Sequence, residues 1–229
     1  MRAVLFDATG TLLLFRESVG EVYRAFALEF GVDLPATRIQ EAFRRILSGS
    51  EPMVFPGETG ERCRSLERQW WWHRVRSTFR AADSTARFTD FDAYFDRLLN
   101  HYAAGAAWRL APGSRRALGE LHARQVPMAV VSNFDHRLPK ILEELEILEY
   151  FANVTIPAEV GAAKPDRRIF EAALEGLGNP SRRAIYVGDR AVEDVEGARG
   201  AGLLPIQVQS LATLAELPSH IDALEQETK

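Results

Sequence analysis

Short apolar runs alternate along this chain with longer segments that have helical spacing. Residues 3–6, 128–131 and 184–187 are apolar at every position, and each run ends in polar residues. Runs of this length are typical of parallel strands that are buried on both faces. From Pro112 onward, such runs alternate with helical patterns. The pattern therefore predicts βα units and a parallel sheet, an α/β fold.

The segment between the first apolar run and about residue 100 has a different pattern, which is helical throughout. Ser18 and Glu21 form a capping box at the start of one expected helix. Apolar residues then recur at helical spacing within residues 39–47 and 91–102. We therefore expect a helical insertion directly after the first strand.

This pattern leads to a division of the chain into two parts. We expect a core domain made of residues 1–14 and 95–229, and a helical domain made of residues 15–94. Because crossover connections are right-handed, the first strand is expected at the centre of the sheet.

Composition narrows the class of protein. The chain has 229 residues, 46% of them hydrophobic, and a net charge of −4, so we expect a packed core and no nucleic-acid partner. Cys63 is the one cysteine, which excludes an internal disulfide and suits a reducing cytoplasm. No apolar stretch is long enough to span a bilayer, and the scattered histidines do not suggest a zinc site. We expect a cytoplasmic protein, monomeric or homodimeric, with no membrane partner.

Polar residues that could take part in catalysis or ligand binding follow the three apolar runs or lie between them. They are Asp7, Ser132, Asn133, Lys164, Asp189 and Asp194. The carboxyl ends of parallel strands meet at one edge of a sheet, where ligands bind in open α/β folds. Carboxylates, a hydroxyl and one ammonium group at that edge suit metal-assisted chemistry on a phosphate, because positioning and charge neutralisation dominate phosphoryl transfer.

The order and spacing of these segments resemble the haloacid dehalogenase superfamily of hydrolases, over nearly the whole chain. The most specific part is the stretch 188–202, with Gly188, Asp189 and Asp194. Residues 70–72 and 131–135 are further similar to the subfamily called haloacid dehalogenase-like hydrolase domain-containing protein three. The resemblance implies a Rossmann-like core with a helical cap after the first strand. It also implies that the strands before Ser132 and Asp189 flank the strand before Asp7.

The resemblance also implies roles for individual residues. Asp7 would attack phosphorus and form an aspartyl-phosphate, Ser132 would bind a phosphoryl oxygen, and Lys164 would offset the negative charge. Substrate contacts are expected at Thr11, Ser132, Asn133 and Lys164. Magnesium is the expected cofactor, with Asp7, Asp189, Asp194 and the main-chain carbonyl of Thr9 as its expected ligands or orienting groups. The expected substrate is a small phosphorylated metabolite.

Thr9 departs from the superfamily pattern. Phosphatases of this superfamily usually have a second Asp at this position, which protonates the leaving oxygen. A threonine has no suitable pKa for that role, and acid–base help is worth about 10²–10⁴ in rate. Three interpretations stay open: a slow phosphatase that prefers substrates such as acyl phosphates, a 2-haloacid dehalogenase-like enzyme, or a binding protein that has kept the site. The pair Gly188 and Asp189 favours a metal and a phosphoryl group.

Three adjacent tryptophans, Trp70, Trp71 and Trp72, form the most unusual part of the helical segment. Consecutive helical residues point about 100° apart, so the three indoles cannot enter one face. We expect one or two to pack within the helical domain and another to face the cleft or the core domain.

Overall fold

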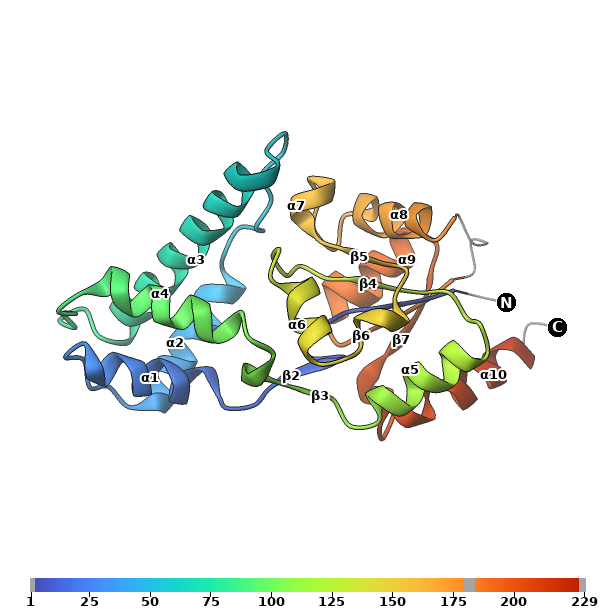
Figure 1. Ribbon diagram of the computed structural model, residues 1–229, viewed down its shortest axis with the longest axis horizontal. Helices are drawn as coiled ribbons and strands as arrows, with labels where there is room; N and C mark the ends of the chain where they lie inside the picture. Colours follow the sequence, from blue (N-terminus) through green and yellow to red (C-terminus); the bar gives the residue numbers. More distant parts are fainter. Residues whose placement is uncertain (1–2, 179–183, 227–229) are drawn as a thin grey trace.

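The computed structural model describes residues 3–178 and 184–226 and places a parallel sheet beside a helical domain (Figure 1). The sheet consists of β1 (Val4–Phe6), β4 (Met128–Val131), β5 (Asn153–Thr155), β6 (Ile185–Gly188) and β7 (Leu204–Gln207). Its order is β5-β4-β1-β6-β7, and every pair is parallel. The expected parallel sheet is therefore confirmed, with β1 at its centre and β4 and β6 on either side.

Helices cover both faces of this sheet, which explains the uninterrupted apolar runs. Successive side chains of a strand point to opposite faces. Val4 and Phe6 pack with residues of α5 (Ser114–Ala123), α6 (Leu138–Glu144) and α10 (Leu217–Gln226). Leu5 packs on the other face with residues of α8 (Arg167–Gly176) and α9 (Gly197–Gly200).

The helical domain has a hydrophobic core of its own. It contains α1 (Val19–Glu29), α2 (Ala36–Ser48), α3 (Gly60–Ala82) and α4 (Phe91–Tyr102). Buried side chains such as Tyr23, Ile39 and Phe79 pack together there, in a cluster separate from those of the sheet. The capping box at the start of α1 is present, with Glu21 N–H donating to Ser18 Oγ at 3.2 Å and Ser18 N–H donating to the Glu21 carboxylate at 3.1 Å.

A two-stranded antiparallel ribbon joins the two domains. It pairs β2 (Leu13–Phe15) with β3 (Trp108–Leu110). Tyr94, Phe95 and Leu98 of α4 pack in the hydrophobic core of the helical domain. The division at residue 95 stays a proposal, and this packing favours moving the second boundary to β3.

Smaller elements complete the described chain. They are α7 (Pro157–Val160), a π-helical turn (Ala191–Glu196) and 3₁₀ turns at Gly105–Ala107, Leu148–Tyr150, Val208–Ser210 and Leu214–Glu216. Among residues 3–178 and 184–226, no helix has the length and apolar character needed to cross a membrane.

Candidate active site

Asp7 lies directly after β1, at the carboxyl edge of the sheet. Its N–H donates to the carbonyl of Val187 at 2.9 Å, which extends the pairing with β6, and its side chain is buried. The chain then turns sharply, because the carbonyl of Ala8 accepts the N–H groups of three residues, from Thr11 at 3.3 Å to Leu13 at 2.8 Å. Burial raises the pKa of the Asp7 carboxyl, against the opposing effect of the nearby Lys164 ammonium.

Asp189 follows β6 and lies against this turn. Gly10 has φ of +98°, and a Cβ there would fall 2.5 Å from Asp189 Oδ2. Glycine is therefore required at position 10 for both the backbone conformation and the close approach. Burial, followed by the charges of Asp7 and Asp194, raises the pKa of Asp189 to about 6.

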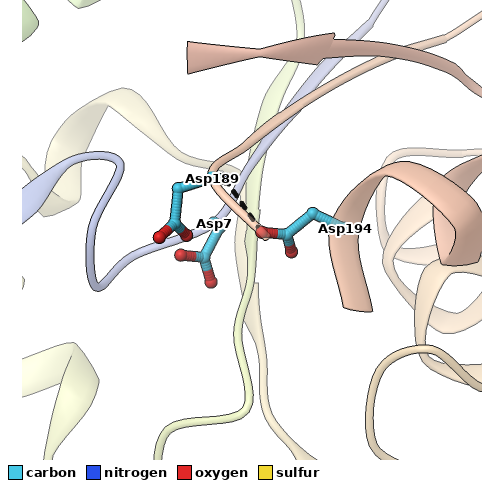
Figure 2. Close-up of side chains that lie close together, drawn as sticks. All are labelled: Asp7, Asp189 and Asp194. Atoms are coloured by element: carbon cyan, nitrogen blue, oxygen red, sulfur yellow. Dashed lines mark hydrogen bonds between the residues drawn. The ribbon is translucent and has the colours of Figure 1, made fainter. Parts of the chain in front are cut away.

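Asp194 completes a cluster of carboxylates. One oxygen of each of Asp7, Asp189 and Asp194 lies within 4.8 Å of the others (Figure 2). Asp194 is fully buried in the π-helical turn, and such turns are frequent at functional sites. Its Oδ2 accepts the N–H groups of Asp189 and Arg190, each at 2.9 Å. Asp194 therefore holds the turn that carries Asp189.

Lys164 neutralises part of this negative charge. Its Nζ donates to Asp7 Oδ1 and Asp194 Oδ1, both at 2.6 Å, and to the hydroxyl of Tyr186 at 2.8 Å. Burial lowers the pKa of Lys164, but the two carboxylates outweigh that effect and the net shift is upward. All three ammonium hydrogens have acceptors, so the lysine is charged and fixed in position.

The loop after β4 holds the backbone of Lys164. Asn133 Nδ2 donates to the Lys164 carbonyl at 3.0 Å, and the Lys164 N–H donates to Asn133 Oδ1 at 2.7 Å. Ser132 is buried, and its N–H donates to the carbonyl of Thr155 at 3.1 Å. Asn133 therefore contacts the lysine that lies beside Asp7, although the two residues are far apart in sequence.

The two threonines of the first loop are also buried at their hydroxyl groups. Thr9 Oγ1, Thr11 Oγ1 and Asp189 Oδ1 have no hydrogen-bond partner within the described chain. Unpaired buried oxygens are costly, and they fit a site that binds a cation or a polar ligand. With three clustered carboxylates, this donor set fits magnesium, which prefers hard oxygen ligands.

Sequence reasoning missed one member of the site, Tyr186. Its hydroxyl lies 2.9 Å from Asp194 Oδ1 as well as 2.8 Å from Lys164 Nζ. Burial raises the pKa of this phenol well above its usual value, so it is neutral and can donate a hydrogen bond to Asp194. A phenol in the middle of an otherwise aliphatic strand is the signal that could have identified it.

Comparisons with known proteins agree with this geometry. The family model for haloacid dehalogenase-like hydrolases matches residues 1–202. The chain belongs to the haloacid dehalogenase-like hydrolase family. It is 33% identical over 206 residues to haloacid dehalogenase-like hydrolase domain-containing protein 3 of Mus musculus, covering 89% of this chain and 80% of that protein.

Solved structures with the same fold include enzymes with different activities. One is a haloacid dehalogenase-superfamily phosphatase from Thermococcus onnurineus, with a TM-score of 0.65, 22% identity, and coverage of 96% of this chain and 98% of that one. Another is a 2-haloacid dehalogenase from Pseudomonas syringae pv. Tomato DC3000, with a TM-score of 0.62, 20% identity, and coverage of 98% and 99%. The fold alone therefore does not distinguish a phosphatase from a dehalogenase, and the distinction rests on the residues of the site in this hydrolase.

Proposed function

We propose that this hydrolase is a magnesium-dependent phosphatase that acts through an aspartyl-phosphate on Asp7. The observation that carries the proposal is the carboxylate cluster of Asp7, Asp189 and Asp194 around a single lysine. With all groups ionised, the cluster has two more negative than positive charges. Such an excess in a buried site favours a bound divalent cation.

The same charge excess argues against a 2-haloacid as the substrate. A haloacid brings a further carboxylate, and Lys164 already binds two carboxylates and a phenol. A phosphoryl group also brings negative charge, but a magnesium ion held by the carboxylates would offset it. Retention of Asp189 beside Asp7 therefore favours the phosphatase.

The residues of the cluster have distinct proposed roles. Asp7 and Asp189 would hold magnesium together with the main-chain carbonyl of Thr9. The bound ion would neutralise charge on the phosphoryl oxygens. Both oxygens of Asp194 already accept hydrogen bonds from Lys164 and from main-chain N–H groups. We therefore assign Asp194 to orientation of the site and of metal-bound water.

In the proposed reaction, an Asp7 carboxylate oxygen forms a bond to phosphorus as the bond to the leaving oxygen breaks. The leaving group departs with the electron pair. Water then attacks the aspartyl-phosphate, which releases inorganic phosphate and restores Asp7. Lys164 stabilises the charge on Asp7 and on the transferred group, and Ser132, Thr11 and Asn133 are the proposed contacts to substrate or to its binding loop.

Thr9 determines which phosphates would react fastest. A leaving alkoxide needs a proton, and Thr9 cannot supply it at neutral pH. A leaving carboxylate needs none. We therefore propose acyl phosphates, or other small phosphorylated metabolites with weakly basic leaving groups, as the better substrates.

One experiment tests the proposal against both alternatives. Acetyl phosphate, p-nitrophenyl phosphate and 2-chloropropionate are each incubated with the protein, with magnesium or with EDTA. Magnesium-dependent release of phosphate supports the phosphatase. Release of chloride in EDTA supports the dehalogenase. A halide leaves without a proton, so that reaction needs no acid at position 9. No turnover with any substrate, combined with magnesium and phosphate binding by calorimetry, supports a binding protein.

We propose a cytoplasmic location and a small-molecule substrate as well. The single, buried Cys63 suits a reducing compartment. A sedimentation measurement distinguishes the two expected oligomeric states, a monomer and a homodimer.

A further inference from the structure

The three adjacent tryptophans of α3 use their indole N–H groups in different places. Trp70 Nε1 donates to the carbonyl of Glu51 at 3.1 Å, and Trp72 Nε1 donates to Asp92 Oδ1 at 2.7 Å. Both acceptors belong to the helical domain. Trp71 Nε1 instead donates at 2.7 Å to Oδ2 of Asp135, in the loop after β4 of the core domain. The middle indole therefore connects the two domains, as expected for one of the three.

A second contact lies one helical turn before Trp71. Glu67 precedes it by four residues, so the two side chains share a face of α3. The carboxylate of Glu67 bonds to Nδ1 of His136, and Glu67 is only 2% exposed although it carries a carboxyl group. Two consecutive residues of the core loop, Asp135 and His136, thus receive two contacts from one face of α3.

Asp135 is also bound by Arg137, two residues further along the same loop. Arg137 Nε and Nη2 bond to its two carboxylate oxygens at 2.8 and 2.5 Å, and the Arg137 N–H donates to Oδ1 at 3.0 Å. Burial raises the pKa of Asp135, but Arg137 outweighs this effect and the net shift is downward. The Trp71 indole therefore donates to an ionised carboxylate, a stronger bond than one between neutral groups.

The loop that receives these contacts also reaches the active site. We call residues 132–137 the β4–α6 loop. At its start, Asn133 bonds to both main-chain polar groups of Lys164, whose ammonium lies beside Asp7. At its end, Asp135 and His136 contact α3. Since few residues separate the two ends, a displacement of α3 would move Asn133 and Lys164.

We infer that Trp71 and Glu67 are positioning residues. They couple the position of the helical domain relative to the core to the positions of Ser132, Asn133 and Lys164. With both contacts made, the loop is held in the arrangement described above. With the contacts broken, the loop loses two of its anchors. The kinetic part of this inference rests on the proposed function, whereas the coupling itself does not.

Amide hydrogen exchange of the whole protein tests the coupling without reference to activity. Trp71→Phe keeps an aromatic ring and removes the indole donor together with one of the two fused rings. We expect faster exchange in residues 132–137 and 160–166, by about tenfold or more, the scale of losing a hydrogen bond to a charged group. Glu67→Gln is the second variant and should accelerate exchange in the same segments.

The neighbouring tryptophans supply matched controls. Trp72→Phe removes an indole bond to a carboxylate, as Trp71→Phe does, and Trp70→Phe removes one to a main-chain carbonyl, but both bonds lie within the helical domain. They should leave exchange in residues 132–137 unchanged. Equal acceleration in all three tryptophan variants would show general loosening of the helical domain and overturn the inference, as would no acceleration in Trp71→Phe and Glu67→Gln.

Steady-state kinetics provide a second test of the positioning role. With acetyl phosphate and magnesium, Trp71→Phe should lower kcat by about tenfold and leave KM within about twofold, because transition-state positioning is lost rather than ground-state binding. Unchanged kcat in this variant contradicts the positioning role. If wild type shows no turnover, the proposed function fails, and the exchange measurement still decides whether the two domains are coupled.

Discussion

Gly10 lies so close to Asp189 that a Cβ at position 10 would fall 2.5 Å from Oδ2 of that carboxylate. The loop after β1 and the loop after β6 therefore fit together only with glycine at this position. Together with the pairing of β1 and β6, this close contact allows Asp189 to lie beside Asp7. The proposed metal site depends on that spacing.

Gly10→Ala should lower both the stability of the protein and its affinity for magnesium. The φ of +98° at Gly10 disfavours alanine, at a cost of about 1–2 kcal/mol in stability. Displacement of Asp189 should also weaken magnesium binding by about 10–100-fold, the scale for disturbing groups that orient a metal ligand. Calorimetry with magnesium measures the effect.

Gly202→Ala is the control for that variant. Gly202 has φ of +81°, and no heavy atom lies within 4 Å of a Cβ built there. It should lose similar stability and keep the magnesium affinity of wild type. Equal affinities in the two variants would remove the proposed link between Gly10 and the metal.

Lys164→Met should impair both stability and turnover. It leaves Asp7 and Asp194 buried without their shared cation, which costs about 3–5 kcal/mol of stability for a broken buried pair. The value of kcat for acetyl phosphate should fall by about 10²–10³, the scale of losing one preorganised donor. Urea denaturation and steady-state kinetics measure the two effects.

Lys140→Met provides the comparison, because Lys140 is exposed and pairs with Glu144 at 3.5 Å on the surface of α6. Its effect should be below about 1 kcal/mol. If Lys164→Met behaves like Lys140→Met, Lys164 has no part in the chemistry.

The raised pKa of Asp189 predicts a dependence of stability on pH. In metal-free protein this pKa is about 6, above the ordinary value of 3.8, because burial and the nearby carboxylates disfavour the ionised form. The folded state therefore binds the proton more tightly than the unfolded state. The stabilisation that this shift contributes is complete below the pKa of Asp189 in the unfolded state. It is lost as pH rises through about 6, the pKa of Asp189 in the folded state.

Comparison of wild type with Asp189→Asn isolates this contribution. In EDTA, the free energy of unfolding of wild type relative to the variant should decline between about pH 4 and pH 7. Urea denaturation at several pH values measures it. A difference that does not change with pH would mean that Asp189 titrates normally.

Thr9→Asp tests the proposed reason for slow turnover. The new carboxyl group would stand two residues after Asp7 on the same short loop. Turnover of an alkyl phosphate should rise by about one to three orders of magnitude, within the usual worth of acid catalysis. Turnover of acetyl phosphate should change little, because its leaving group needs no proton. An equal change for both substrates, or none, would favour the dehalogenase or the binding protein.

The sequence predicts the parts of the site that follow from strand ends. Asp7 and Asp189 meet because β1 and β6 are adjacent and parallel, which the apolar runs and their crossover connections indicate. The contact of Lys164 with Asp7 also agrees with the role that the family resemblance implies.

Other features depend on packing that the pattern of residues does not specify. Tyr186 reaches Lys164 because strand alternation turns it toward α8, opposite to Ile185 and Val187. Trp71 meets Asp135 only through the relative position of the two domains, which no local pattern determines. The inclusion of α4 in the core of the helical domain likewise depends on long-range contacts.

The most direct test of the central claim compares wild type with Asp7→Asn, using acetyl phosphate in the presence of magnesium. The amide is nearly isosteric with the carboxylate but is a poor nucleophile. We expect phosphate release by wild type and none above background by the folded Asp7→Asn variant, with EDTA abolishing the wild-type reaction. Turnover by Asp7→Asn close to that of wild type would contradict an aspartyl-phosphate on Asp7.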